Sequence, residues 1–448
     1  MHKNTASLEF WSEELEYSKL PDERFRSNLV KMCHSLQEKP EHSFSSACGE
    51  VVRKSAHRLF SKEESIDIQL GHRHKTLERC KNHNRILVIE DTADLNYSSH
   101  KSTKGLGGLG GKNTKGLNIH SAMVLTTEAE PLGLIGQYIW APRASGRKKK
   151  NHNYSIQEKE SFKWIRTKNW VNEWFEDYHG QVIVVGDREA DFYEHFSWSR
   201  KQSIELLIRA QHLNRNIFYK GNKTKVSKIP ELVEELGKLE VTIPRQKNRK
   251  KRKAQLSLRV AKIEYPPAYH KKGKTHSLTL VHVKEIEKEG IKSPVEWYLL
   301  TTLEVNNFDE AYEVLHFYVL RWPIERFHLV LKSGLKVERL QFDVFIRLKH
   351  ALEVCSLVAW QLLWLAYIGK AKPNAIAAEV FDTIEIEILK QYTGVKIKTV
   401  TDFILALGSL SGFAKSKVQP LPGEKLLWQS LKLLRAMKLG YMLKTKPP

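Results

Sequence analysis

Two apolar runs of the sequence each end abruptly in an aspartate. Arg85–Asp91 reads RILVIED, and Gln181–Asp187 reads QVIVVGD. In sheets flanked by helices, catalytic groups collect at the carboxyl ends of strands, so both side chains stand where chemistry is usually done. With a glutamate from a later helix, they would supply the oxygen ligands that hold two divalent cations for phosphodiester chemistry. A strand-ending aspartate is also an ordinary helix cap or turn former.

The glutamate, Glu325, lies in a segment whose polar residues recur at helical spacing. The segment reads YVLRWPIERFHLVLK, in which Tyr318, Arg321, Glu325 and Lys332 stand at i, i+3, i+7 and i+14. A continuous helix would set all four on one stripe, which could line a cleft while apolar residues on its other sides are buried. The simpler interpretation is a surface helix with an Arg321–Glu325 ion pair at i,i+4.

Pro323 and Gly334 set the expected limits of this helix. Proline is favoured at the first position of a helix, and glycine suits the position just after its end. We therefore expect a break near Trp322 and a helix that runs from there to Ser333.

The composition indicates a globular protein with a polyanionic partner. The chain has 448 residues, enough for two to three domains, and 41% of them are hydrophobic. Lys and Arg number 73 against 51 Asp and Glu, which gives a formal net charge of +22. A charge of this size attracts polyanions, so nucleic acid is the expected partner and an anionic membrane surface is the alternative.

The sequence shows neither a membrane anchor nor an export signal. The most apolar run, Val354–Ile368, contains Ser356 and Gln361 and is shorter than the ~20 residues that a spanning helix needs, so we expect a buried helix. The N-terminus has no apolar core of a signal peptide. Four cysteines without regular spacing favour a reducing compartment. We therefore expect a cytoplasmic protein that does not enter a membrane.

The expected elements divide the chain into three domains and predict an α/β fold. Residues 1–80 have helical apolar spacing, which suits either a DNA-contacting module or a plain helical bundle. The stretches with this spacing are Glu13–Leu36 and Glu50–Phe60. Residues 81–369 form the expected catalytic domain, interrupted at about 204–302 by a β-rich insertion. Its expected strands are Ile204–Arg209, Leu239–Ile243, Ala254–Ile263, Ser277–Val283 and Trp297–Thr301. Residues 370–448 are expected to be helical, docking on their own chain or pairing with a second copy.

The most basic run of the chain lies between two of these expected strands. It reads RQKNRKKRK from Arg245 to Lys253. Cations beside β-ribbons suit a phosphate clamp, and a solvated hairpin loop is the alternative. The expected DNA contacts in this run are Arg245, Lys247, Arg249, Lys250, Lys251, Arg252 and Lys253.

Two other stretches approach known ligand motifs without matching them. His72, His74, Cys80 and His83 invite a zinc site, but their spacing fits none of the usual ligand pairs. The glycine-rich stretch Lys104–Gly116 lacks two residues that a phosphate-binding loop requires. A mobile basic loop between strands fits it better.

Three motifs, in order along the chain, carry a resemblance to a known family. They are IEDT at Asp91, DREAD from Asp187 to Asp191, and Tyr318-(2)-Arg321-(3)-Glu325-(6)-Lys332. With a β-rich insertion before the third motif, the chain resembles a bacterial insertion-sequence DDE transposase of the branch that cuts and pastes through a DNA hairpin. The resemblance covers most of the chain. Ala93 departs from the family's usual threonine and Asp94 adds a carboxylate; Asp91 remains the expected ligand, with Asp94 as the fallback.

The resemblance implies an RNase H-like catalytic core interrupted by the insertion, with helical N- and C-terminal domains. Asp91, Asp187 and Glu325 would be the catalytic residues and the ligands of two Mg2+ or Mn2+ ions. Arginine and lysine would make charge-assisted contacts with the DNA backbone near the cut. The DNA contacts implied outside the basic run are Arg188, Tyr318, Arg321, Lys332 and Trp297.

Trp297, in the sequence PVEWYLLTT, matches an insertion-domain tryptophan that such enzymes stack on a base flipped out at the hairpin. Stacking on an extruded base suits an aromatic side chain near the end of a strand. The alternative is a buried strand tryptophan, because Tyr298 and Leu299 compete for core positions.

The function that the resemblance implies is DNA transposition. The protein would bind the terminal inverted repeats of double-stranded DNA, act as a homodimer that joins two ends, and associate with the bacterial nucleoid. One strand is nicked, the freed 3′-OH forms a hairpin, and after hairpin opening the 3′-OH attacks target DNA. Each step is an in-line phosphoryl transfer that two metal ions can catalyse. The alternatives are a basic DNA-binding protein with a decayed catalytic core and a nuclease without strand transfer.

Overall fold

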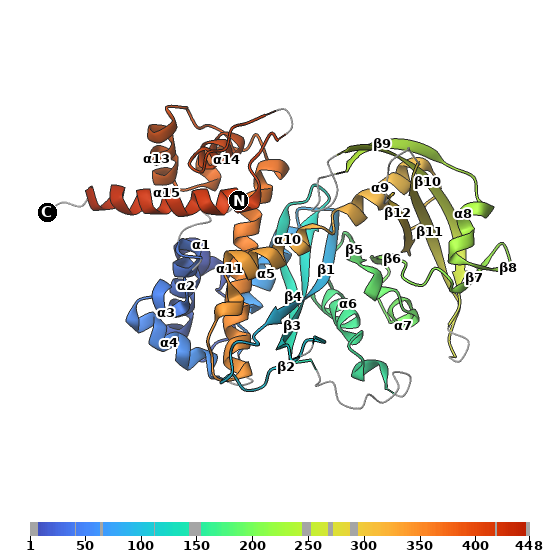
Figure 1. The fold of residues 1–448 in the computed structure, drawn as a ribbon, viewed down its shortest axis with the longest axis horizontal. Coiled ribbons are helices and arrows are strands. Elements are labelled where there is room, and N and C mark those ends of the chain that lie inside the picture. The colour runs from blue at the N-terminus through green and yellow to red at the C-terminus, as the bar shows by residue number, and fades with distance from the viewer. Residues whose placement is uncertain are drawn as a thin grey trace. The chain divides into compact units, whose positions relative to one another are not determined.

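The chain forms a mixed α/β structure with two compact units (Figure 1). The computed structural model describes residues 8–40, 42–62, 66–111, 113–142, 154–243, 252–267, 272–286, 294–416 and 419–444. The sheet unit comprises residues 83–91 and 148–322, and the helical unit comprises 1–82, 92–147 and 323–448. The chain therefore passes from one unit to the other directly after Asp91 and again directly after Trp322.

The sheet unit is built on one mixed β-sheet. Its strands run in the order β1-β5-β6-β12-β11-β10-β7-β8, with β9 also paired to β10. β1, β5 and β6 are parallel, and the remaining pairs are antiparallel. The bounds are β1 Arg85–Asn96, β5 Gln181–Gly186, β6 Ile204–Arg209, β7 Asn216–Tyr219, β8 Asn222–Lys225, β9 Gly237–Ile243, β10 Arg252–Tyr265, β11 His276–Glu285 and β12 Glu296–Thr301.

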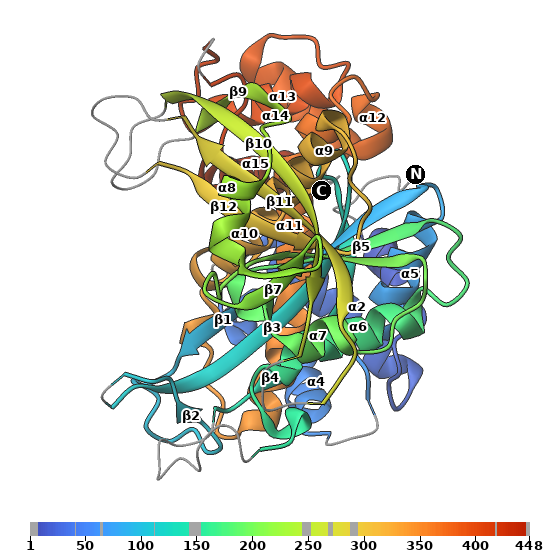
Figure 2. The same ribbon diagram turned by 90° about the vertical axis from the view of Figure 1, so that its right-hand side faces the viewer.

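The expected strands of the insertion are confirmed. β6 has the predicted bounds, and β9 to β12 each contain the predicted stretch with short extensions. β10, β11 and β12 lie side by side as long antiparallel neighbours (Figure 2). The short strands β7 and β8 were not predicted, because Asn222–Lys225 carries no apolar alternation that would indicate a strand.

Helices flank the sheet of this unit. The largest are α6 Phe162–Trp174 and α9 Phe308–Val319, and α9 packs against β10 and β11. Asn307 caps α9 by accepting a hydrogen bond from the Glu310 backbone N–H. The shorter elements are the 3-10 turns Ile156–Glu158, Arg188–Ala190 and Val226–Lys228, with α7 Tyr193–Ser197 and α8 Ile229–Leu232.

β1 is longer than the sequence predicted. Its apolar half pairs with β5 in the sheet unit, but the strand runs on through Asp91 to Asn96 in the helical unit. The prediction that Asp91 ends a strand is therefore wrong, because the polar residues after it continue an extended strand. There they lie beside β3, where Thr92 Oγ1 is 3.0 Å from His120 Nδ1 and the Tyr97 N–H donates to the Lys115 carbonyl.

The other strands of the helical unit form an antiparallel ladder. They are β2 Gly107–Gly108, β3 Lys115–Thr126 and β4 Pro131–Trp140, in the order β2-β3-β4. β2 lies inside the glycine-rich stretch, which therefore forms a hairpin into β3. Lys104 at its start exchanges backbone hydrogen bonds with Asp343 and Phe345, so this stretch is fixed to a distant part of the same unit.

Both ends of the chain supply helices to the helical unit. The N-terminal ones are α1 Leu8–Glu14, α2 Glu23–Glu38, α3 Phe44–Ala47, α4 Glu50–Phe60 and α5 Leu70–Cys80. α4 is confirmed, and the stretch Glu13–Leu36, which Pro21 was expected to interrupt, is divided between α1 and α2 around that proline. The C-terminal ones are α10 Pro323–Leu329, a π-helical turn Val330–Gly334, a 3-10 turn Val337–Arg339, α11 Phe345–Ala371, α12 Ala377–Val380, α13 Thr383–Thr393, α14 Val400–Ser409 and α15 Glu424–Lys444.

α11 is the central helix of this unit. It is the one helix of the described residues that is long and apolar enough to cross a membrane, and 83% of its most apolar window is buried inside the protein. It packs against α2, α4, β4, α14 and α15. Because elements from both chain ends cover this helix, they belong to one unit, and the predicted domain limits at residues 80 and 370 do not separate compact units.

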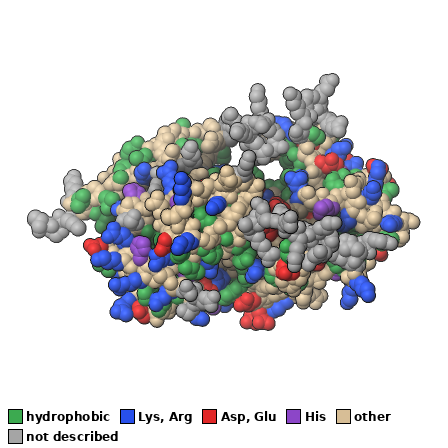
Figure 3. All heavy atoms as spheres, turned by 60° about the horizontal axis from the view of Figure 1, so that its bottom comes forward, with side chains coloured by type: hydrophobic (Ala, Val, Ile, Leu, Met, Phe, Trp, Pro, Cys, Tyr) green, Lys and Arg blue, Asp and Glu red, His purple; other side chains and the backbone are tan. Residues whose placement is uncertain are grey.

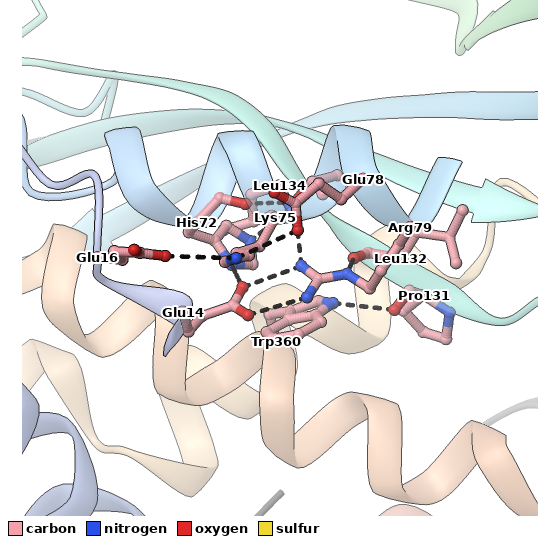
Figure 4. Close-up of polar contacts among 11 residues, drawn as sticks. Glu14, Glu16, His72, Lys75, Glu78, Arg79, Pro131, Leu132, Leu134 and Trp360 are labelled. Carbon is pink, nitrogen blue, oxygen red and sulfur yellow. Dashed lines mark hydrogen bonds and ion pairs between the residues drawn. The ribbon is translucent and has the colours of Figure 1, made fainter. Parts of the chain in front are cut away.

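A buried ion pair joins α1 and α5 to the strands and to α11 (Figure 4). Glu14 is fully buried and accepts two hydrogen bonds of 2.9 Å from Arg79, whose guanidinium lies 4.7 Å from the Trp360 ring centroid. His72 Nδ1 lies 2.5 Å from Glu14, and His72 Nε2 accepts from the Leu134 N–H at 2.8 Å. These two contacts fit a neutral imidazole protonated on Nδ1, and burial lowers the pKa of His72 accordingly.

Replacing Glu14 by Gln should destabilise the helical unit, because it leaves the part-buried Arg79 without a counter-charge. We expect the free energy of unfolding to fall by about 3–5 kcal/mol in denaturant titrations of the full chain. The matched control is Glu16→Gln, which removes a more exposed carboxylate 3.6 Å from Lys75 and should change it by less than about 1 kcal/mol. Equal stability of the two variants would contradict the role given to Glu14.

The effect of Glu14 should depend on pH. Burial raises the pKa of this carboxyl, but the Arg79 charge and the His72 hydrogen bond outweigh it and hold the pKa well below 4.5. A depressed pKa in the folded state stabilises the protein above the unfolded pKa, and this contribution is lost as the pH falls. The stability difference between the native protein and Glu14→Gln should therefore shrink below about pH 4.5.

Candidate functional site

The parallel pairing of β1 and β5 brings two of the three predicted carboxylates together. The β1–β5 ladder ends at the pair Ile89–Val185, and each aspartate follows two residues later in its own segment. The two carboxyl groups are near enough for the Asp91 charge to raise the pKa of Asp187. The Arg321 guanidinium interacts with both carboxylates. Its Nη1 lies 3.9 Å from Asp91 Oδ1, and its charge lowers the pKa of Asp187.

The environment of Asp187 disfavours its negative charge. Burial raises the pKa of this carboxyl, and the nearby Asp91 charge raises it further, against the hydrogen bond from the Glu189 N–H and the Arg321 charge. A bound cation reduces the repulsion between two neighbouring carboxylates. Oxygen donors of this kind suit hard divalent ions such as Mg2+ or Mn2+.

The DREAD residues form a tight turn after β5. Asp187 caps the turn by accepting from the Glu189 N–H at 2.8 Å, and Glu189 pairs with Lys163 of α6 at 2.9 Å. Arg188 is exposed, as a DNA contact requires. The turn therefore holds one carboxylate against the sheet while it presents a guanidinium to solvent.

Asp191, the last residue of the motif, is a buried acceptor. It accepts hydrogen bonds from the backbone N–H groups of Gln211 and His212, from the Tyr265 hydroxyl, and from Arg215 at 2.5 Å. All of these partners come from elements after β6. Asp191 thus ties the motif turn to the insertion.

A buried glutamate and lysine lie beneath the two aspartates. Glu90 precedes Asp91 on β1, and strand alternation directs it to the opposite face. Burial raises the pKa of Glu90 well above its ordinary value, although a hydrogen bond with Thr167 and the charge of Lys168 favour its ionised form. Burial lowers the pKa of Lys168 to about 7, and its ammonium donates to the His195 carbonyl. The sequence did not predict this pair, because Glu90 stands within an apolar run and belongs to no motif.

Three predicted DNA contacts and one unpredicted arginine form a cluster in the sheet unit. The Trp297 and Tyr318 rings meet edge to face with centroids 5.2 Å apart, and the Arg209 guanidinium lies 5.7 Å from the Trp297 ring centroid. Burial raises the pKa of the Tyr318 hydroxyl, against the charge of Arg321 and a hydrogen bond with Arg209. Trp297 is half-buried, so the interpretation as a fully buried core tryptophan is wrong.

Glu325 belongs to the helical unit, and the predicted polar stripe is not one continuous helix. Leu320–Trp322 separate α9 from α10, which leaves Tyr318 and Arg321 in the sheet unit. The predicted break and the start at Pro323 are confirmed. The segment after α10 continues as a π-helical turn through Ser333 to Gly334. Glu325 stands in the first turn of α10 and is half-buried.

A contact within the helical unit places α10, the helix that carries Glu325, beside β3. His328 Nε2 of α10 lies 3.3 Å from Ser121 Oγ on β3, while Thr92 meets the neighbouring His120. Successive strand residues face opposite ways, so the side of β3 that α10 contacts is opposite to the side that Thr92 contacts.

Lys332 is held by the helical unit itself. Its ammonium donates to the Asp94 carbonyl at 2.7 Å and lies 3.6 Å from the Glu338 carboxylate. The contact with Asp94 ties the π-helical turn to the end of β1. A phosphate contact of Lys332 therefore competes with these two partners.

Two residues of the basic run belong to β10 rather than to a loop. Arg252 forms a bidentate pair with the buried Glu285 of β11, and Lys253 lies 2.7 Å from Glu240 of β9. Their charges are thus compensated across the sheet, which local sequence does not reveal. The other predicted contacts of the run, Arg245, Lys247, Arg249, Lys250 and Lys251, lie outside the described residues.

No family model matches this sequence. Within the described residues, no group of three or more His, Cys, Asp or Glu side chains is arranged to hold a metal ion. His72, one of the residues whose spacing does not fit a zinc site, is engaged by Glu14 and the Leu134 N–H. The site residues that the sequence missed are Arg209, Glu90 and Lys168, which occur singly in strands or helices and have no motif.

Replacing Asp191 by Asn should test its structural role. The substitution leaves the part-buried Arg215 without its counter-charge, so we expect the free energy of unfolding to fall by about 3 kcal/mol or more. Glu189→Gln, which removes an exposed carboxylate from the same turn, should cost less than about 1 kcal/mol. If denaturant unfolding shows Asp191→Asn to be as stable as Glu189→Gln, Asp191 does not anchor the turn.

Proposed function

We propose that this protein is a metal-dependent DNA transposase that cleaves the ends of its element through a hairpin and joins their 3′ ends to target DNA. The observation that carries the proposal is the proximity of Asp91 and Asp187 after the paired strands β1 and β5, with Arg321 next to them. It agrees with the three ordered motifs of the sequence. Glu325 is proposed as the third carboxylate.

An RNase H-like core is part of the proposal. Support comes from each unit separately. The sheet unit holds the parallel strands β1, β5 and β6, and the helical unit holds the antiparallel β3-β4 pair beside the continuation of β1. The strand β1 thus has β5 as a parallel partner along its first half and β3 as an antiparallel neighbour along its second half.

The covalent chain supports Glu325 as the third carboxylate. Three residues lie between Arg321 and Glu325, and the four residue steps that join their Cα atoms span at most about 14 Å.

The donor set fits the proposed cofactor, two Mg2+ or Mn2+ ions. Asp91, Asp187 and Glu325 would hold them. Burial, together with the nearby Asp91 charge, raises the pKa of Asp187, and a bound cation would favour its ionised form. When bound, the ions neutralise charge on the attacking and leaving oxygens of an in-line displacement. Arg321 would then turn from Asp91 to a DNA phosphate, as a charge-assisted contact.

The charge and aromatic groups of the sheet unit fit a DNA partner. Trp297 carries Arg209 near one face and is half-exposed, so its ring is available to stack on an extruded base. The formal net charge is +22, and Lys and Arg side chains spread over much of the face drawn in Figure 3. Cations at this density draw the phosphate backbone without reading its sequence.

A homodimer on DNA is also proposed, since two ends must be joined in one event. α15 offers a surface for it, because Leu433, Leu439 and Leu443 on this helix are 45%, 58% and 72% exposed. Leu439 and Leu443 are four residues apart and so lie on one face of the helix, and exposed apolar side chains that lie together mark interaction surfaces.

The proposal is tested by Glu325→Gln, which keeps the shape of the side chain and removes its charge. Incubation of the purified protein, Mg2+ and linear DNA that carries the inverted repeats flanking this gene should give nicked, hairpin and joined products. The variant should lose more than about 100-fold of the nicking rate, since even indirect ligand contacts are worth 10–100-fold. DNA binding should persist.

Glu379→Gln is the matched control, because Glu379 is an exposed glutamate of the same unit. A Glu325→Gln protein that nicks as fast as this control would refute the assignment. A native protein that binds DNA equally with and without EDTA and never cleaves would support the decayed, purely DNA-binding alternative. Nicking without joined products would support the nuclease.

Trp297→Ala should affect hairpin formation more than the first nick. Stacking on an extruded base contributes roughly 1–3 kcal/mol, so we expect the hairpin step to slow about 5- to 150-fold in single-turnover assays. Trp297→Phe should retain most of the rate because it keeps an aromatic face. Equal slowing of both steps in Trp297→Ala would indicate a structural rather than a stacking role.

A further inference from the structure

A cavity of about 680 Å³ opens beside Asp187 in the sheet unit. Its walls come from the turn after β5, the start of α7, the loop after β6 and the 3-10 turn before α6. The lining residues that matter here are Ile156, Lys159, Arg188, Phe192, Gln211 and His212. None of Trp297, Tyr318, Arg209 or Arg321 lines it, so this cavity is distinct from the aromatic cluster.

The acidic side chains of this cavity are already engaged within the protein. Glu189 pairs with Lys163, and Asp191 is saturated by Arg215, the Tyr265 hydroxyl and two backbone N–H groups. The charge of Glu194 acts on Arg215. Apart from Asp187 itself, the carboxylates of the wall are therefore compensated.

The basic side chains of the cavity, unlike its carboxylates, are not engaged by other side chains of the described residues. Lys159, Arg188 and His212 have no ion pair or side-chain hydrogen bond with any residue in the described parts of the chain. Arg188 and His212 are exposed, and Lys159 is half-exposed. Three basic side chains converging on one cavity make a site for an anion, and arginine matches the geometry of phosphate oxygens.

The remaining wall is suited to a nucleobase. Phe192 is half-buried and stacks on the buried His195 with ring centroids 5.4 Å apart and planes at 21°, which fixes its ring. Ile156 adds a second apolar contact, and the exposed Gln211 offers an amide that both donates and accepts. The volume falls within the 300–1,000 Å³ range of small-ligand sites, which is enough for one nucleotide.

We propose that this cavity holds one nucleotide of a DNA strand other than the one bound at Trp297. Its phosphate lies against Arg188, Lys159 and His212, and its base lies against Phe192. The inference rests on the proposed transposase function and deepens it, because strand joining requires two DNA strands at one set of carboxylates. The second strand has two possible sources, the DNA that flanks the element and the target DNA.

The first test measures nucleotide binding without any reaction. A fluorescent single-stranded ten-nucleotide DNA is titrated with the full-length protein in EDTA over a range of salt concentrations. The Lys159→Ala/Arg188→Ala variant should bind at least about tenfold more weakly. The slope of log affinity against log salt should fall in magnitude by about 1.4, because each phosphate contact with a single strand contributes about 0.7. Phe192→Leu should weaken binding with an unchanged slope, because it removes stacking and no charge.

The matched control is Lys223→Ala/Lys225→Ala, which removes two exposed cations of the same unit outside the cavity. If the cavity variant and this control lose the same affinity and the same salt slope, and Phe192→Leu binds as the native protein does, the nucleotide site is refuted. Circular dichroism and thermal unfolding establish that every compared variant is folded.

The second test identifies the source of the strand. Uncut element ends report nicking, and pre-cut ends with a supercoiled plasmid report joining. A loss of joining of about tenfold or more, with nicking unchanged, assigns the cavity to target DNA, and the reverse assigns it to flanking DNA. Unchanged rates in both arms overturn the inference. If the native protein neither nicks nor joins, the proposed function fails, and the binding experiment alone decides on the nucleotide site.

Discussion

The account depends on the parallel pairing of β1 with β5. Five consecutive residue pairs fix the register, and residues 86–90 of β1 are buried on both faces of the sheet. Asp91 and Asp187 follow this paired stretch, so two like charges lie near each other. Arg321 beside Asp91 moderates this repulsion, and in the proposed function divalent ions would remove it. On the other face of the same strand, the buried Glu90 makes a hydrogen bond with Thr167 of α6 and interacts with the charge of Lys168.

The basic side chains that were expected to bind DNA differ in whether they already pair with groups of the protein. Carboxylates or carbonyls of the protein already bind the side chains of Arg252, Lys253 and Lys332. Within the described residues, the side chains of Arg188 and Lys159 form no such pair. The net charge of the chain therefore overstates how many cations are available to a ligand. Burial and pairing, more than the number of basic residues, decide which of them bind phosphate.

Sequence reasoning succeeded where the signal was local. β5 and β6 are apolar runs bounded by polar residues, and Pro323 marked the start of α10, so these limits were predicted. It failed where the cause lay far along the chain. β1 continues past Asp91 because β3 lies beside it, Arg252 pairs with Glu285 on the next strand, and α11 gathers helices from both chain ends. Single residues such as Arg209 carry no periodic signal and become visible only through their contacts.

The most direct test of the central claim is to map which backbone segments lie next to a bound divalent ion. Fe2+ is substituted for Mg2+, ascorbate and peroxide generate hydroxyl radicals at the ion, and mass spectrometry locates the cuts. The account predicts cuts near Asp91, Asp187 and Glu325 together, all of which disappear in Asp187→Asn and upon addition of excess Mg2+. Cuts near the aspartates without any near Glu325, or a pattern that Asp187→Asn leaves unchanged, would contradict it.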